Sequence, residues 1–70
     1  MQEKLISTLE NQIHTLDTEI LHFLDRRKQI IQAYNDISGE EYGTDISELL
    51  SEAQDLGLDN NYITTIWKNI

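Results

Sequence analysis

Apolar side chains recur every three or four residues from Leu5 to Tyr34, which is the spacing of one face of an α-helix. Proline is absent from the chain and Gly39 is the first glycine, so no helix breaker interrupts this period. The pattern predicts one long helix over residues 2 to about 36. The stretch NDISGEEYG (35–43) is rich in turn-forming residues and indicates where this helix ends.

Two shorter helices are predicted after this turn. Asp45 followed by Glu48 resembles a capping box, and Gly57 stands where a left-handed residue commonly follows a helix. Asp59 is a good N-cap for the last helix. The apolar faces are Ile46, Leu49, Leu50, Ala53 and Leu56 in the second helix, and Ile63, Ile66, Trp67 and Ile70 in the third. The chain is therefore predicted to be all-α, with one long and two short helices in a single domain, residues 1–70.

The lengths of the helices predict self-association. A helix of about 35 residues is about 50 Å long, whereas a compact domain of 70 residues has a radius of gyration of about 11 Å. The two short helices cannot cover the apolar stripe of the long one, and small soluble monomers rarely leave a large apolar patch in water. A helical homodimer in which two long helices pair is the simplest solution.

Composition narrows the classes of partner. Lys and Arg total 5 against 13 for Asp and Glu, a net charge of −8, which disfavours nucleic acid and anionic membranes as partners. No apolar run approaches the ~18 residues of a spanning helix and no signal-peptide pattern opens the chain, so a cytoplasmic location is expected. The chain has no cysteine, and His14 and His22 lie away from the stripe, so no metal site is expected.

Arg27 falls in the middle of the apolar stripe, and the pattern leaves two explanations open. The side chain can snorkel, or pair within an interface with a carboxylate such as Glu10 or Asp17 on the flank of the stripe. Alternatively, Arg27 can grip an anion in a cavity, because the guanidinium fork matches a carboxylate bidentately.

Both ends of the chain resemble the all-helical chorismate mutases. LENQIHTLDTEILHFLDRRKQI (9–30) is similar to the family's first helix, in which an arginine, here Arg27, follows an aspartate, here Asp17, by ten residues. GLDNNYITTIWKNI (57–70) is similar to its third helix. The resemblance implies an intertwined dimer of three-helix chains. It also implies the rearrangement of chorismate to prephenate without a cofactor, by positioning and cationic stabilisation.

The resemblance also assigns site positions. Arg27 matches the arginine that grips a substrate carboxylate, and is the one catalytic residue carried over. The family's second arginine, which the partner chain supplies, falls at Glu10, where the charge is reversed. The family's lysine beyond its first helix falls near Ser38, so this chain has no lysine at that position. The substrate-binding positions are therefore Arg27, Glu10 and Ser38. The arginine–glutamate pair of the second helix aligns loosely with Glu41 and Tyr42, and a C-terminal glutamine or glutamate would lie beyond Ile70.

Two functions follow from these assignments. The first is a chorismate-mutase-like dimer that has lost catalysis and serves as a dimerisation, regulatory or partner-binding module, because one arginine in so acidic a chain holds a dicarboxylate poorly. In that dimer Glu10 of one chain approaches Arg27 of the other, with Asp17 as the other candidate. The alternative is an active or weak chorismate mutase, or a related isochorismate lyase, using Arg27. A third interpretation is a generic helical interaction hairpin, and a partner of another kind of protein stays open beside the homodimer.

Overall fold

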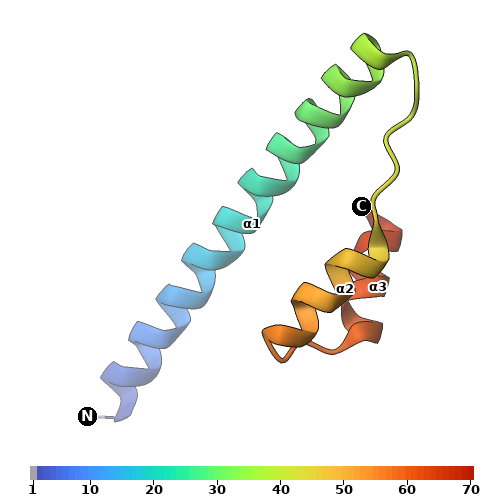
Figure 1. The fold of residues 1–70 in the computed structure, drawn as a ribbon. Helices are drawn as coiled ribbons and strands as arrows, with labels where there is room; N and C mark the ends of the chain where they lie inside the picture. The colour runs from blue at the N-terminus through green and yellow to red at the C-terminus, as the bar shows by residue number, and fades with distance from the viewer. Residues whose placement is uncertain (1) are drawn as a thin grey trace. The chain divides into compact units, whose positions relative to one another are not determined.

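The chain folds into three helices with no strand among the residues that the structure describes. The computed structural model describes residues 2–70. The helices are α1 (Gln2–Ser38), α2 (Ile46–Asp55) and α3 (Asn60–Asn69) (Figure 1). The predicted all-α class, with one long helix followed by two short ones, is confirmed. Among residues 2–70, no helix combines the length and the apolar character that crossing a membrane requires.

The first helix runs two residues further than the sequence pattern predicted. Asp36 to Ser38 keep helical geometry, and the helix ends at Gly39, whose φ is 72°. The Gly39 amide donates to the carbonyl of Asn35 at 2.9 Å, which closes the last turn. A left-handed residue at this position suits glycine, because a Cβ would clash with the backbone there. The asparagine and aspartate near the end of the helix were therefore weaker stop signals than the glycine.

Each short helix begins with the aspartate cap that the sequence predicted. The Asp45 carboxylate accepts a hydrogen bond from the Glu48 amide at 3.2 Å, and the Asp59 carboxylate accepts one from the Asn61 amide at 3.3 Å. These bonds satisfy amides that have no partner within the first turn of a helix. Local side-chain chemistry thus fixes where α2 and α3 start.

The turn between α2 and α3 is a Schellman motif. The Leu58 amide donates to the carbonyl of Ala53 at 2.9 Å, and the Gly57 amide donates to that of Gln54 at 3.0 Å. Gly57 has a φ of 77°, so the left-handed residue predicted from the sequence is present. The short connection places α2 and α3 against each other as a helical hairpin (Figure 1).

Contacts divide the chain into two compact units. The first runs to Glu40 and contains α1; the second covers Glu41–Ile70 and contains α2 and α3. In the second unit only Ala53, at 5% exposed, and Ile63, at 6%, are buried. Around them lie half-buried side chains from both helices: Ile46, Leu49, Leu50, Ile66 and Trp67. Leu56, expected on the same face, is 77% exposed because it is the C-cap residue, where the chain already leaves the helix.

The small core makes a direct stability test possible. Ile63→Ala should lower the free energy of unfolding of the second unit by about 2–5 kcal/mol, because it leaves a cavity beside Ala53. Tyr62→Ala is the matched control one residue away, since Tyr62 is 60% exposed, and it should cost about 1 kcal/mol or less. Fluorescence of Trp67, the only tryptophan, followed during urea unfolding measures both variants. Equal losses in the two variants would show that Ile63 is not the centre of this core.

Candidate functional site

The most prominent feature of α1 is a row of apolar side chains that repeats every seven residues. Alternate spacings of three and four residues place nine of them at the a and d positions of successive heptads. The a positions are Ile6, Ile13, Ile20 and Tyr34, and the d positions are Leu9, Leu16, Phe23, Ile30 and Ile37. We call this row the heptad face. The row extends to Ile37, beyond the Leu5–Tyr34 range of the 3.6-residue period, and Leu24 and Ile31, which are e positions, lie beside it.

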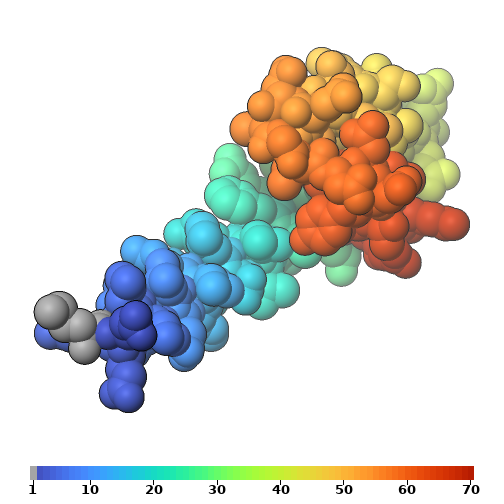
Figure 2. Space-filling view, turned by 90° about the horizontal axis from the view of Figure 1, so that it is seen from below, coloured from blue at the N-terminus to red at the C-terminus, as the bar shows by residue number. Residues whose placement is uncertain are grey.

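All nine side chains of the heptad face are exposed. Their exposed fractions lie between 45% and 88%. Within the described part of its unit, residues 2–40, α1 is the only helix, so no other element of that unit covers them. Figure 2 shows the side chains of α1, coloured blue to green, following one another along this one helix. Contiguous exposed apolar surface of this extent is typical of sites where proteins associate.

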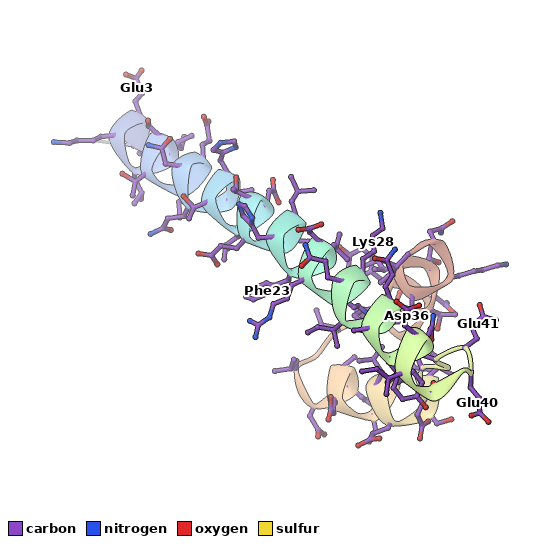
Figure 3. The ribbon with its side chains drawn as sticks, turned by 90° about the horizontal axis from the view of Figure 1, so that it is seen from above. Glu3, Phe23, Lys28, Asp36, Glu40 and Glu41 are labelled. Carbon is purple, nitrogen blue, oxygen red and sulfur yellow. The ribbon has the colours of Figure 1, made fainter. Side chains whose placement is uncertain are left out.

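Arg27 occupies the remaining a position, between Ile20 and Tyr34. It is half-buried, and it takes part in an interaction within the chain. Phe23 and Lys28 point away from α1 on different sides, which separates the heptad face from the charged outer face (Figure 3). The arginine is therefore a single charge inside an otherwise apolar row, as the sequence predicted.

Several polar side chains on the outer face of α1 form hydrogen bonds within the helix. The hydroxyls of Thr8, Thr15 and Thr18 each donate to the carbonyl four residues earlier, at 3.0 to 3.1 Å. Gln29 donates to the Asp25 carboxylate at 2.9 Å, also one turn apart. These local bonds leave the heptad face as the side of α1 suited to a partner.

Charges are unevenly distributed along α1. Residues 2–25 of the helix carry five acidic residues and one basic residue, whereas Arg26, Arg27 and Lys28 follow directly after them. The five acidic residues are Glu3, Glu10, Asp17, Glu19 and Asp25. The three consecutive cations stand out in a chain with a net charge of −8. The charge along α1 therefore changes from mainly negative in residues 2–25 to positive at residues 26–28.

The three substrate-binding positions assigned from the resemblance do not meet in one chain. Glu10 and Arg27 are separated along α1 by about 25 Å, at about 1.5 Å per residue, and Ser38 lies about 16 Å further on. Ser38 ends the helix, and its hydroxyl accepts a hydrogen bond from the Glu40 amide at 3.1 Å and lies 3.2 Å from the Glu40 carbonyl oxygen. A site built from these residues therefore requires a second chain.

The second unit offers a shallow hollow of about 380 Å³, lined by Thr44, Ile46, Thr64, Trp67 and Lys68. Lys68 is the single cation of this lining, so the hollow lacks the paired cations that would hold a dicarboxylate. Among residues 2–70, no three His, Asp or Glu side chains are grouped to hold a metal ion.

Comparison of the chain with protein-family models, with curated protein sequences and with solved structures finds no match.

Proposed function

We propose that this chain is a self-associating helical module whose heptad face binds the same face of a second copy. The observation that carries the proposal is the row of nine exposed apolar side chains on a helix that is alone in its unit. Apolar residues at the a and d positions of successive heptads are the pattern with which helices pair by knobs-into-holes packing. The chorismate-mutase-like intertwined dimer is the form of this assembly that the sequence resemblance favours.

The area available on the heptad face is enough for a stable dimer. Burying a side chain of this size contributes about 1.5–3 kcal/mol. At about 25 cal/mol per Å² of apolar surface, this energy corresponds to about 60–120 Å² of buried area for each side chain. Nine such side chains from each of two copies remove about 1,100–2,200 Å² from water. Stable interfaces bury about 1,200–2,000 Å² in total. A second copy of α1 is therefore an adequate occupant.

The size of each unit supports the same conclusion. A helix without tertiary contacts depends on propensity alone and is marginal in water. The second unit, Glu41–Ile70, has only Ala53 and Ile63 fully buried, and domains below about 40 residues usually need oligomerisation, metals or disulfides. Metals and disulfides are not available to a chain without cysteine or a grouped set of ligands in residues 2–70. Association with a second copy is a source of burial that needs neither.

We further propose that the assembly is not catalytic. Of the positions carried over from the mutase resemblance, only Arg27 is a cation; Glu10 adds negative charge and Ser38 is hydrogen-bonded to Glu40. A dimer carries twice the net charge of −8, which opposes the entry of a doubly negative substrate. The proposed role of the module is therefore association: it joins two copies of itself, or it binds a further protein through the same interface.

Dimerisation is tested by light scattering coupled to size exclusion. At micromolar concentration the measured mass should be twice the 8.2 kDa of one chain. Ile13→Asp should weaken the dimer about a hundredfold or more, because each copy loses one buried apolar side chain and gains a charge in the interface. Asn11→Asp adds the same charge on the outer face and should leave the mass unchanged. A chain that remains helical and monomeric, or that associates only with a different protein, would overturn the homodimer.

Catalysis is tested by following chorismate disappearance with the purified chain. The expected turnover is far below the ~10 s⁻¹ of an ordinary enzyme. Arg27→Met is the control for any residual rate, since that rate should be lost if Arg27 binds the substrate. Turnover within about tenfold of ~10 s⁻¹, abolished in Arg27→Met, would establish the alternative function, a working mutase.

A further inference from the structure

The charges along α1 and the place of Arg27 in the heptad face determine how two copies fit together. We propose that the two α1 helices pair antiparallel, with Arg27 of each copy over the partner's Leu16 and beside the partner's Asp17. This inference rests on the proposed self-association and specifies its geometry. Three arrangements compete: a parallel pair, the proposed antiparallel pair, and an antiparallel pair shifted by one heptad. The positions of the charged residues distinguish them.

A parallel pair is disfavoured by Arg27. In a parallel two-stranded coil each a position faces its own copy, so two guanidinium groups would meet in the middle of the interface. The flanking charges form no complementary pairs between the two chains in that arrangement, because Glu19 then lies beside the partner's Leu24, and Arg26 beside the partner's Ile31. Two like charges in partly desolvated surroundings repel strongly.

An antiparallel pair places each a position opposite a d position of the partner. One register uses all ten positions of the row, including Arg27, in five kinds of layer, each formed twice by symmetry. The layers are Ile20 with the partner's Phe23, Leu16 with the partner's Arg27, Ile13 with the partner's Ile30, Leu9 with the partner's Tyr34, and Ile6 with the partner's Ile37. No apolar member of the heptad face is left in water.

The flanking charges are complementary in this register. Glu19 lies level with the partner's Arg26 on one side of the interface, and symmetry forms this ion pair twice. On the other side Arg27 lies level with the partner's Asp17, which is next to Leu16 in sequence and at the edge of the interface. A guanidinium that reaches a carboxylate at the rim keeps its charge partnered while its methylenes cover Leu16.

The neighbouring register, shifted by one heptad, is the one that brings Glu10 of one chain to Arg27 of the other, as the resemblance implied. That shift places Asp17 beside the partner's Asp17 and Glu19 beside the partner's Glu19 at the centre of the dimer. It also moves Ile37, the most exposed member of the heptad face, beyond the end of the partner's helix. Larger shifts shorten the overlap by a heptad each. Like charges at the centre and a shorter face therefore disfavour the shifted register.

Charge reversal tests the proposed pairing of Glu19 with the partner's Arg26. Glu19→Arg and Arg26→Glu should each weaken the dimer about three- to thirtyfold at low ionic strength, because each replaces two attractive pairs by two repulsive ones. The double variant Glu19→Arg/Arg26→Glu should recover most of the affinity and keeps the net charge of −8. Within one helix these positions are two turns apart, about 10 Å, so recovery reports contact between chains.

Lys28→Glu is the matched control, because it changes the net charge as Arg26→Glu does but lies on the outer face. Sedimentation equilibrium of the full chain gives the dissociation constant of each variant. In the shifted register Arg26 faces the partner's Gln12 and Glu19 faces itself, so neither single variant would behave as expected and the double variant would show no recovery. That pattern, or an equal loss in Lys28→Glu, would overturn the proposed register.

Disulfide trapping gives an independent reading, since the chain has no cysteine of its own. Mixing the Ile6→Cys chain with the Ile37→Cys chain under oxidation should yield the mixed disulfide as the main product. A main product of Ile6→Cys with Ile30→Cys indicates the shifted register, and Ile6→Cys with itself indicates a parallel pair. Each of these products, or a dimer that forms no disulfide, would overturn this inference while the proposed self-association stands. A wild-type chain that is monomeric would overturn both.

Discussion

A single helix cannot bury its own apolar face, and this constraint governs the whole molecule. α1 presents nine apolar side chains at heptad spacing and is the only helix in the described part of its unit. Backbone hydrogen bonds keep the helix regular, but they are formed equally well in any long helix and add little net stability. In the proposed dimer, the free energy that orders α1 therefore comes from covering the heptad face. The second unit, with two buried residues, adds little to it.

The arginine in this face illustrates a general trade between stability and uniqueness. A methionine or leucine in place of Arg27 would complete the apolar row and bury more area. Such a row, however, would pair about equally well in several registers and in both directions, since every layer would then be apolar. One charged a position restricts the choice, as polar residues at single a positions do in other coiled coils. The half-buried state of Arg27 in α1 is compatible with this role.

Local structure was predictable from the sequence, whereas the position of a second chain along α1 was not. Asp45, Asp59 and Gly57 act through bonds to residues two or three positions away, so their sequence context was sufficient to place both short helices. The end of α1 was misjudged by two residues because polar residues tolerate a last helical turn and Gly39 does not continue it. Glu10, Arg27 and Ser38 form no common site in one chain, and their relation depends on a neighbour that sequence spacing along one helix cannot position.

The hairpin of α2 and α3 has a consequence for how the molecule folds. Its caps, its Schellman turn and its core pair join residues close together in sequence, all within Asp45 to Ile66. Contacts of such short range form in microseconds. In the proposed dimer, the pairing of two α1 helices is instead a second-order encounter, whose rate rises with chain concentration and is slowed by mutual repulsion of two acidic chains. Refolding should then show a rapid phase independent of concentration at Trp67, and a slower phase in helix content that accelerates as the chain is concentrated.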